Sequence, residues 1–372
     1  MQKRVLLMYI SKNSGHHHAC CAMEDALHSL SRDVETLLID SFQYTNPILE
    51  KIVSKTYSSI IKRKPEVWGN IYDNPSFVKK TQSLRDSIHK YNSNKMKTLL
   101  GQFKPDAVIC AQAFPCGILA DYKKKFTSNF LLTGVLTDYA AHAYWVYDNV
   151  DMYFVPSEET RERLILKGIA PDRIKYTGIP VSPKFNKIVD KTKVLKNLGL
   201  VSTKPTVLVM GGSQGIGPMK ELAKILNASS MDFQLILVAG GNKRLYRNLT
   251  KITRRSDKKT LVLGYVENID ELMEISSLVI SKPGGITTSE SLAKGLPMLI
   301  INPIPGHEQK NTDHLLKYKV AVKVDRVQDA EILTRELLSN TGTLKIMADR
   351  AKSISKPDSA ICIAREVLER IM

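Results

Sequence analysis

The stretch Ser281-Lys282-Pro283-Gly284-Gly285-Ile286-Thr287-Thr288-Ser289-Glu290 follows a short apolar run that ends at Ile280. This pattern predicts a buried strand, a tight turn and a helix that begins near Thr287. Glycines let a backbone approach a diphosphate closely, and a helix N-terminus favours negative charge. The carboxylate of Glu290 is suited to accept hydrogen bonds from both hydroxyls of a ribose. Gly-Gly turns are common, and an acid in a first helical turn also complements the helix dipole. Alone, the stretch predicts a β/α unit with an anion-binding turn.

Two further turns in the same half of the chain carry candidate ligand groups. Gly211-Gly212-Ser213-Gln214 follows a predicted strand, and we expect a second anion-binding turn there, although the spacing of Gly212, Gly215 and Gly217 is not that of a dinucleotide fingerprint. Segment 304–311, which contains Glu308 and Asn311, follows another strand, and its polar groups are suited to bind sugar hydroxyls. A solvated helix start explains segment 304–311 equally well.

Short apolar runs alternate with helical stretches along the chain. Several runs are apolar on both faces, as strands of a parallel sheet are. Helices are expected after His16 and over 46–64, 76–103, 116–125 and 157–168. The predicted strands are Val5–Ile10, Val34–Ile39, Ala107–Cys110, Phe130–Val135 and Met152–Val155, then Thr206–Met210, Gln234–Val238, Thr260–Leu263, Leu278–Ile280, Met298–Ile301 and Ala321–Val324. Alternation of this kind predicts an α/β fold with two doubly wound, Rossmann-like lobes that face each other across a cleft.

The division between the lobes is expected at Gly178-Ile179-Pro180-Val181-Ser182-Pro183, because glycine and proline end helices and strands alike. The length of 372 residues suits two lobes better than one core. We therefore expect a first lobe over residues 1–180, a second over 181–356, and a C-terminal segment at 357–372.

The first lobe offers candidates for a catalytic base. Gly15 and His16 follow the first predicted strand, and Asp138 follows the strand Phe130–Val135. A histidine or an aspartate at the carboxyl end of a strand can deprotonate a hydroxyl group. A structural or capping role for His16 is as good an interpretation from the residues alone. His142 and Trp145 come shortly after Asp138 and are expected to line the same cleft.

The net charge of +17 is concentrated in one segment. Residues 51–104 contain twelve Lys or Arg and three acidic residues, interleaved with Tyr57, Trp68, Tyr72 and Phe77. Basic rims around aromatic anchors are typical of elements that lie on an anionic membrane surface. A solvated helical face is the plain alternative. Nucleic acid binding is the least favoured of the three interpretations, so no nucleic acid partner is expected.

No apolar run approaches the roughly 20 residues that span a bilayer, and the apolar run near the N-terminus is better explained as a strand than as a signal peptide. The five cysteines form no CxxC pair, which favours reduced thiols and a cytoplasmic protein. Adjacent His16, His17 and His18 would point in different directions on a helix, so no metal site is expected.

Together these motifs resemble the glycosyltransferase family of the diacylglycerol glucosyltransferases and monogalactosyldiacylglycerol synthases, and more distantly the peptidoglycan GlcNAc transferase. The resemblance runs from Ser14-Gly15-His16 and Thr137-Asp138-Tyr139 through Leu263-Gly264-Tyr265-Val266 to Pro305-Gly306-His307-Glu308 and Asn311. It is most specific over residues 263–311.

The resemblance implies a GT-B fold with the acceptor lobe first, the UDP-sugar lobe second and a C-terminal helix that returns to the first lobe. It implies an inverting transfer that needs no metal or other cofactor, from a UDP-sugar to a diacylglycerol-type lipid, by a peripheral protein on the inner face of the membrane. His16 or Asp138 would be the base. The residues implied for the UDP-sugar are Gly15, Gly211, Gly212, Ser213, Gln214, Gly264, Tyr265, Val266, Lys282, Pro283, Gly284, Gly285, Ile286, Thr287, Glu290, Glu308 and Asn311.

Three alternatives share part of this pattern. The first is a UDP-GlcNAc transferase that acts on a peptidoglycan lipid precursor. The second is a non-hydrolysing UDP-sugar epimerase, which has the same two-lobed fold. The third is a non-enzymatic basic protein that binds membranes or nucleic acid.

Overall fold

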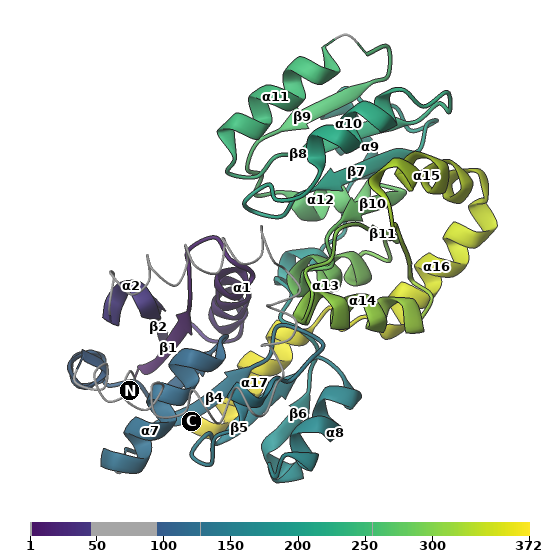
Figure 1. The fold of residues 1–372 in the computed structure, drawn as a ribbon. Coiled ribbons are helices and arrows are strands. Elements are labelled where there is room, and N and C mark those ends of the chain that lie inside the picture. Colours follow the sequence, from purple (N-terminus) through teal and green to yellow (C-terminus); the bar gives the residue numbers. More distant parts are fainter. Residues whose placement is uncertain (1, 46–94, 127, 255) are drawn as a thin grey trace. The chain divides into compact units, whose positions relative to one another are not determined.

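The computed structural model describes residues 2–45, 95–126, 128–254 and 256–372 (Figure 1). Two compact units make up the chain. Unit 1 comprises Met1–Pro183, Ile304–Lys310 and Asp358–Met372, and unit 2 comprises Lys184–Pro303 and Asn311–Pro357. The predicted helix over 46–64, the first part of the helix over 76–103 and most of the basic segment 51–104 lie outside the described residues. Residues 95–103 are helical.

Unit 1 is built on a six-stranded parallel sheet with the order β2-β1-β3-β4-β5-β6. Its strands are β1 (Lys3–Tyr9), β2 (Val34–Asp40), β3 (Ala107–Cys110), β4 (Leu131–Val135), β5 (Met152–Val155) and β6 (Ile174–Tyr176). Its helices are α1 (Gly15–Leu30), α2 (Ser41–Thr45), α7 (Ala113–Phe126), α8 (Glu158–Leu166), α17 (Ser359–Ile371) and the 3-10 turns η1 (Ala143–Trp145) and η2 (Pro171–Arg173). The central strands β3, β4 and β5 are almost wholly buried, as expected when helices cover both faces of a sheet, whereas the edge strands β2 and β6 are partly exposed.

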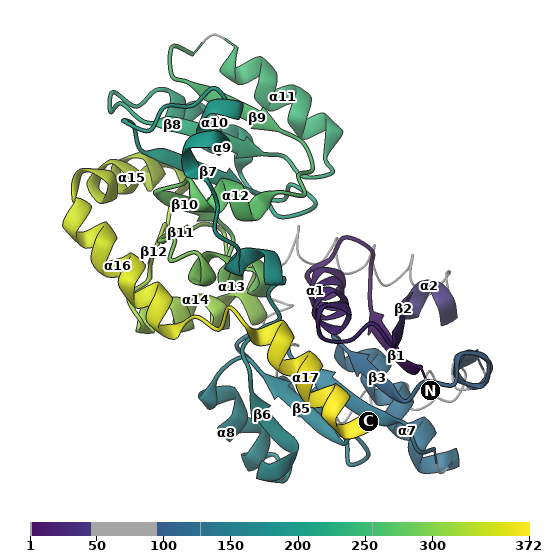
Figure 2. The same cartoon turned by 180° about the vertical axis from the view of Figure 1, so that it is seen from behind.

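Helix α1 carries the first candidate base. Ser14 caps it: the hydroxyl accepts a hydrogen bond from the His17 backbone at 3.2 Å and donates one to the Ile10 carbonyl at 2.8 Å. Helix α17 lies beside α1 in both views (Figures 1 and 2). The Ser359 hydroxyl at the start of α17 donates to the Ile179 carbonyl at 2.7 Å and accepts from the Val181 backbone at 3.0 Å. These bonds fix the C-terminal helix within unit 1.

Unit 2 contains a second six-stranded parallel sheet, with the order β12-β11-β10-β7-β8-β9. Its strands are β7 (Thr206–Met210), β8 (Gln234–Val238), β9 (Thr260–Leu263), β10 (Leu278–Ser281), β11 (Met298–Ile300) and β12 (Ala321–Lys323). Its helices are α9 (Lys191–Asn197), α10 (Met219–Asn227), α11 (Lys243–Thr253), α12 (Ile269–Glu274), α13 (Gly285–Ala293), α15 (Ala330–Ser339), α16 (Thr341–Ile354) and the 3-10 turn η4 (Val327–Asp329). The helix α14 (His307–Lys317) and the 3-10 turn η3 (Pro183–Asn186) cross the unit boundary.

The prediction of two Rossmann-like sheets is confirmed, and every predicted strand has a counterpart within two residues at each end. The strand β6 was not predicted, because it is a three-residue edge strand with two exposed side chains and no apolar run. The helix α13 begins at Gly285, two residues before the predicted start. Extended backbone at Gly284, with φ −65° and ψ 142°, ends the turn there. The amides of Gly285, Ile286 and Thr287 therefore belong to the first helical turn.

The strand order of each sheet reverses at one place, and ligands of open α/β sheets bind beside such switch points at the carboxyl ends of the strands. In unit 2 the reversal lies between β7 and β10, because β8 and β9 extend one way and β11 and β12 the other. In unit 1 it lies between β1 and β3. The glycine turns after Met210 and Ser281 and the helix start that carries His16 all follow strands at these switch points.

Candidate functional site

The turn after β10 has the properties of an anion site. The first amides of a helix have no acceptor within the helix, and they carry the positive end of its dipole. At the start of α13 these amides belong to Gly285, Ile286 and Thr287. Gly284 has an ordinary negative φ, and a methyl group added to it would meet no protein atom within 4 Å. Neither backbone geometry nor packing requires glycine at this position, so the open space beside it is available to a ligand.

Buried polar groups continue along α13. The Thr288 and Ser289 hydroxyls are buried without a hydrogen-bond partner among the described residues. Glu290 follows them, and the described part of the chain gives its carboxylate no hydrogen bond or ion pair. Burial and the negative charge of Asp270 raise the pKa of Glu290 to about 8, although the positive charge of Lys184 lowers it. Buried polar groups without a hydrogen-bond partner destabilise a folded protein. They are typical of binding sites, where the ligand supplies the partner.

The turn after β7 is closed by contacts within the protein. Gly215 has φ +61°, and a Cβ there would lie 2.3 Å from the Ala239 carbonyl oxygen. Gly240 has φ +59°, and its Cβ would lie 2.4 Å from the Ser213 carbonyl oxygen. The Gly241 amide donates to that same Ser213 oxygen at 2.8 Å. The turns after β7 and β8 are thus packed backbone to backbone, and glycine is required for folding.

Side-chain hydrogen bonds to backbone carbonyls fix the positions of the turns of unit 2. The buried Ser281 hydroxyl donates to the Met210 carbonyl at 3.0 Å, so the ends of β10 and β7 are joined side by side. The buried Asn311 amide donates to the Pro283 carbonyl at 2.9 Å and holds the turn after β10. In the segment Ile304–Lys310, which belongs to unit 1, the Glu308 carboxylate accepts a hydrogen bond from the Ile304 backbone at 2.8 Å. Glu308 and Asn311 therefore already bind backbone groups of nearby loops.

The segment Gly264-Tyr265-Val266 follows β9, and the Tyr265 side chain is 48% exposed. Lys184 braces the residues that follow this segment. Its ammonium group donates to the Glu267 carbonyl and lies 3.5 Å from an Asp270 carboxylate oxygen. Since Lys184 also lowers the pKa of Glu290, one cation links the turn after β9 with the carboxylate of α13. No local pattern in the sequence indicates this role of Lys184, because its partners are 83 or more residues away.

In unit 1 the structure brings His16 and the segment after β4 together. His16 Nδ1 lies 3.0 Å from the hydroxyl oxygen of Thr137, which is 6% exposed. Burial lowers the pKa of His16; the Asp138 carboxylate and a hydrogen bond with the backbone of Ala111 oppose this, and His307 of the same unit reinforces it. The imidazole is therefore neutral near pH 7 and able to accept a proton.

The two other predicted residues of unit 1 lie next to each other. Burial, with smaller contributions from Lys167, His307 and His16, lowers the pKa of His142 to about 3. His142 is therefore neutral near pH 7 and a weak base. Trp145 is 4% exposed and belongs to the core of unit 1, with its ring centroid 6.1 Å from that of His142. The tryptophan thus packs in the interior and supports the histidine.

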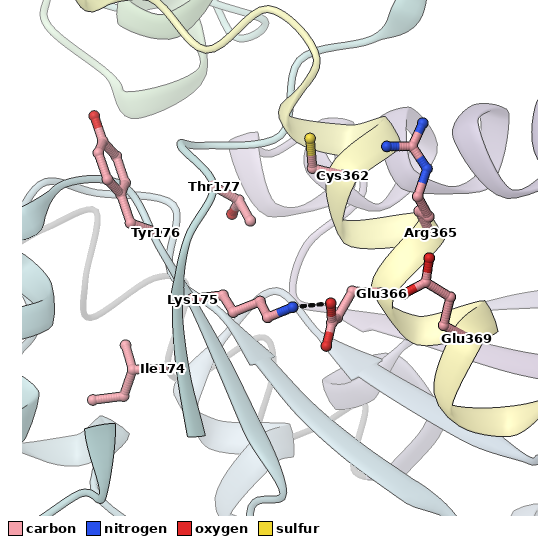
Figure 3. Close-up of a pocket in the computed structure, with 8 residues that line it drawn as sticks. All are labelled: Ile174, Lys175, Tyr176, Thr177, Cys362, Arg365, Glu366 and Glu369. Atoms are coloured by element: carbon pink, nitrogen blue, oxygen red, sulfur yellow. Dashed lines mark hydrogen bonds and ion pairs between the residues drawn. The ribbon is translucent and has the colours of Figure 1, made fainter. Parts of the chain in front are cut away.

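A separate surface pocket of about 440 Å³ lies between β6 and α17 (Figure 3). Lys175 and Glu366 form an ion pair across it, and none of the predicted site residues lines it. Within the described ranges no three His, Cys, Asp or Glu side chains gather as they would around a metal ion. No helix among the described residues has the length and apolarity to cross a bilayer. All five cysteines are free thiols.

Comparisons with known proteins match both halves of the chain. Residues 16–181 match the family model of monogalactosyldiacylglycerol (MGDG) synthase, and residues 206–365 match the C-terminal domain of glycosyltransferase family 28. A processive diacylglycerol beta-glucosyltransferase from Staphylococcus haemolyticus is 30% identical over 94% of this chain and 88% of its own length. The enzyme of the same name from Bacillus pumilus is 28% identical over 99% of this chain and 95% of its own length.

Solved structures share the fold. Acinetobacter baumannii MurG superposes with a TM-score of 0.66 at 13% identity, with 99% of each chain covered. An S. aureus MnaA–UDP complex gives a TM-score of 0.66 at 14% identity over 100% of this chain and 98% of the other. Anabaena HepE in complex with UDP-glucose gives 0.57 at 14% identity over 99% of each chain. At these identities the likeness establishes the fold alone.

Two Rossmann-like sheets, with a glycine turn and a helix N-terminus at the switch point of the second, define an enzyme of the GT-B class that depends on a UDP-sugar as glycosyl donor. Within that class, the chain belongs to the diacylglycerol glucosyltransferase and monogalactosyldiacylglycerol synthase family. The family prediction from the sequence is confirmed, and this membership disfavours the epimerase and the non-enzymatic alternatives.

Proposed function

We propose that this enzyme transfers a hexose, glucose or galactose, from a UDP-sugar to diacylglycerol or a glycolipid at the membrane surface. The observation that carries the proposal is the full-length similarity to enzymes named processive diacylglycerol beta-glucosyltransferase, together with the open turn at Gly284. The first unit would bind the lipid acceptor and the second the UDP-sugar, with α17 as the part of the C-terminal segment that belongs to the acceptor unit.

In the proposed donor site the diphosphate lies against the turn after β10. The amides at the start of α13 and the helix dipole would stabilise the charge that develops on the β-phosphate as UDP leaves. Lys282 and the turn Gly211-Gly212-Ser213-Gln214 would border the phosphates. Glu290 would bind the ribose, the backbone of Tyr265 and Val266 the uracil, and Glu308 and Asn311 the sugar. Among the described residues the Glu290 carboxylate forms no hydrogen bond or ion pair, and its raised pKa supports this assignment.

The proposed reaction is a single displacement that inverts the anomeric centre. The acceptor oxygen attacks the anomeric carbon from the face opposite UDP, and its proton passes to His16. The lowered pKa of His16 supports its role as the base. Asp138 would then stabilise the imidazolium, and His142 would border the acceptor. Helix amides and backbone groups supply the electrostatic stabilisation, so we propose that no metal is needed.

We place the enzyme on the inner face of the cytoplasmic membrane as a peripheral protein. The basic and aromatic segment 51–104 would contact anionic lipids. Flotation with vesicles tests this: binding to phosphatidylglycerol vesicles that disappears in high salt is expected. Equal binding to neutral and anionic vesicles would remove the electrostatic part of the proposal.

The decisive experiment supplies the full chain with diacylglycerol vesicles and UDP-glucose, UDP-galactose or UDP-GlcNAc, with EDTA present, and identifies the products by mass spectrometry. A hexosyl lipid is the expected product. Activity on a peptidoglycan lipid precursor with UDP-GlcNAc, and none on diacylglycerol, would overturn the proposal. We expect His16→Ala to lower turnover by at least about a hundredfold without weakening UDP binding, because general bases contribute factors of that order. Asp138→Asn, tested in parallel, separates the two candidate bases.

A further inference from the structure

One buried hydrogen bond joins the two acceptor-side motifs of unit 1. Thr137 Oγ1 lies 3.0 Å from His16 Nδ1, although 121 residues separate the two along the chain. Thr137 follows β4, and His16 lies in the first turn of α1 after β1. Two unrelated segments thus meet at one imidazole nitrogen, and Thr137 is 6% exposed, so water competes little for the bond.

The identity of the bonded nitrogen matters for proton transfer. A neutral imidazole has one N–H and one lone pair, and the hydrogen bond at one nitrogen decides which is which. If Thr137 Oγ1 accepts from Nδ1–H, the lone pair is at Nε2. If the hydroxyl instead donates to Nδ1, then Nε2 carries the hydrogen and cannot accept a proton.

We propose that Thr137 is a positioning residue that holds His16 in the Nδ1–H tautomer, with its Nε2 lone pair directed to the acceptor hydroxyl. The inference rests on the proposed function and deepens it. As the acceptor oxygen forms its bond to the anomeric carbon, its proton moves to Nε2, and UDP leaves with the electrons of the broken glycosyl bond. The Nδ1–H···Oγ1 bond persists throughout and becomes charge-assisted once the ring is positive.

Because the Asp138 carboxylate already favours the charged form of His16, a neutral hydroxyl at position 137 suits a base better than a second carboxylate would. Asp138 after β4 and the backbone of Ala111 after β3 favour the charged ring, whereas burial and His307 at the start of α14 disfavour it. His142 is also near and is neutral. A carboxylate in place of Thr137 would raise the pKa of His16 and protonate it before the acceptor arrives. A hydroxyl forms a hydrogen bond with the imidazole without adding a charge, so the base stays unprotonated.

Two substitutions separate the hydroxyl from the rest of the side chain. Thr137→Val keeps the shape and removes the oxygen, and Thr137→Ser keeps the oxygen and removes a methyl group. We expect Thr137→Val to lower kcat about tenfold, with UDP affinity unchanged by calorimetry, because a hydrogen bond to a charged group is worth about that factor. Loss of the acceptor destabilises the imidazolium and lowers the pKa of His16. The acid limb of the plot of kcat against pH should therefore move to lower pH. Thr137→Ser should restore the wild-type limb.

A readout independent of activity is the ¹⁵N spectrum of the imidazoles in the full chain, with the His16 signal assigned by its loss in His16→Gln. The proposal expects Nδ1–H in wild type and in Thr137→Ser, and loss of that preference in Thr137→Val. An Nε2–H tautomer in wild type, or a Thr137→Val enzyme with unchanged kcat and acid limb, would overturn it. If Thr137→Val does not fold, the wild-type and Thr137→Ser spectra still decide. Failure of the proposed acceptor would appear separately, as absence of a glycolipid product while the tautomer is as expected.

Discussion

The two glycine turns at the switch point of unit 2 look alike in sequence and differ in what their glycines do. The turn after β7 folds against the turn after β8, and its Gly215 leaves no room for a Cβ beside the Ala239 carbonyl. The turn after β10 has Gly284 at an ordinary φ, and a Cβ added there would have no protein atom within 4 Å. Gly215 in the first turn is therefore required for packing, whereas Gly284 in the second leaves open space.

This difference shows how a glycine motif can be interpreted. A glycine demanded by positive φ or by close backbone contact is explained by folding, and it carries no separate evidence for a ligand. A glycine that is required by neither a positive φ nor a close backbone contact is better evidence for a ligand that approaches the backbone. Gly284 is of the second kind, and the buried hydroxyls of Thr288 and Ser289 and the carboxylate of Glu290 follow it on the same helix.

The largest effect is expected from Gly215→Ala. The new Cβ would lie 2.3 Å from the Ala239 carbonyl oxygen, at a φ of +61°. We expect a loss of more than about 3 kcal/mol, enough to impair folding of unit 2. Urea unfolding and soluble yield measure it. Gly212→Ala is the matched control, because φ is +67° there but the space is open; it should cost about 1 kcal/mol. Equal losses in both variants would mean that backbone contact is not the cause.

A second, purely functional effect is expected from Gly284→Ala. Alanine fits the negative φ and the open space, and its poorer N-cap preference offsets its lower flexibility, so thermal stability should change little. The methyl group would occupy the space that the proposed diphosphate needs, and the Kd for UDP should rise at least about tenfold. Calorimetry with UDP checks this. An unchanged Kd would place the phosphates elsewhere and would remove the contrast between the turns.

The smallest effect is expected from Glu290→Gln, and it depends on pH. In the free protein the pKa of Glu290 is raised from 4.5 to about 8, so burial penalises the ionised form. That penalty is absent below pH 4.5, grows as pH rises and is complete above pH 8. The Tm of Glu290→Gln should therefore exceed that of wild type by a few degrees at pH 8.5 and by less at pH 5.

Ionisation of Glu290 should strengthen UDP binding, although it lowers the stability of the free protein. The ionised carboxylate is the better acceptor for ribose hydroxyls, so the wild-type Kd should fall between pH 6.5 and pH 9, and the Glu290→Gln variant should lack this fall. Subtracting the variant's profile removes the titration of UDP itself. Parallel profiles in both proteins would rule out contact between Glu290 and the ribose.

Much of the fold follows from local pattern. Apolar runs bounded by glycine and proline predicted the strands, and the alternation with helices predicted two parallel sheets. The pattern missed β6, whose stability comes from pairing with β5 and not from its own three residues. It also misplaced the start of α13, because the pattern could not show that Gly284 takes an extended conformation.

The sequence by itself determined the β/α units, the glycine turns and the candidate residues His16, Asp138 and Glu290, because short-range periodicity and turn chemistry specify them. Only the tertiary structure decided which turns become neighbours. Strand order joins Met210 to Ser281 across 71 residues and brings Thr137 to His16 across 121 residues. Such pairs depend on the burial of whole sheets, and no local pattern encodes them. The same cause separates two glycines of these turns: Gly215 lies against the Ala239 carbonyl, whereas Gly284 has open space beside it.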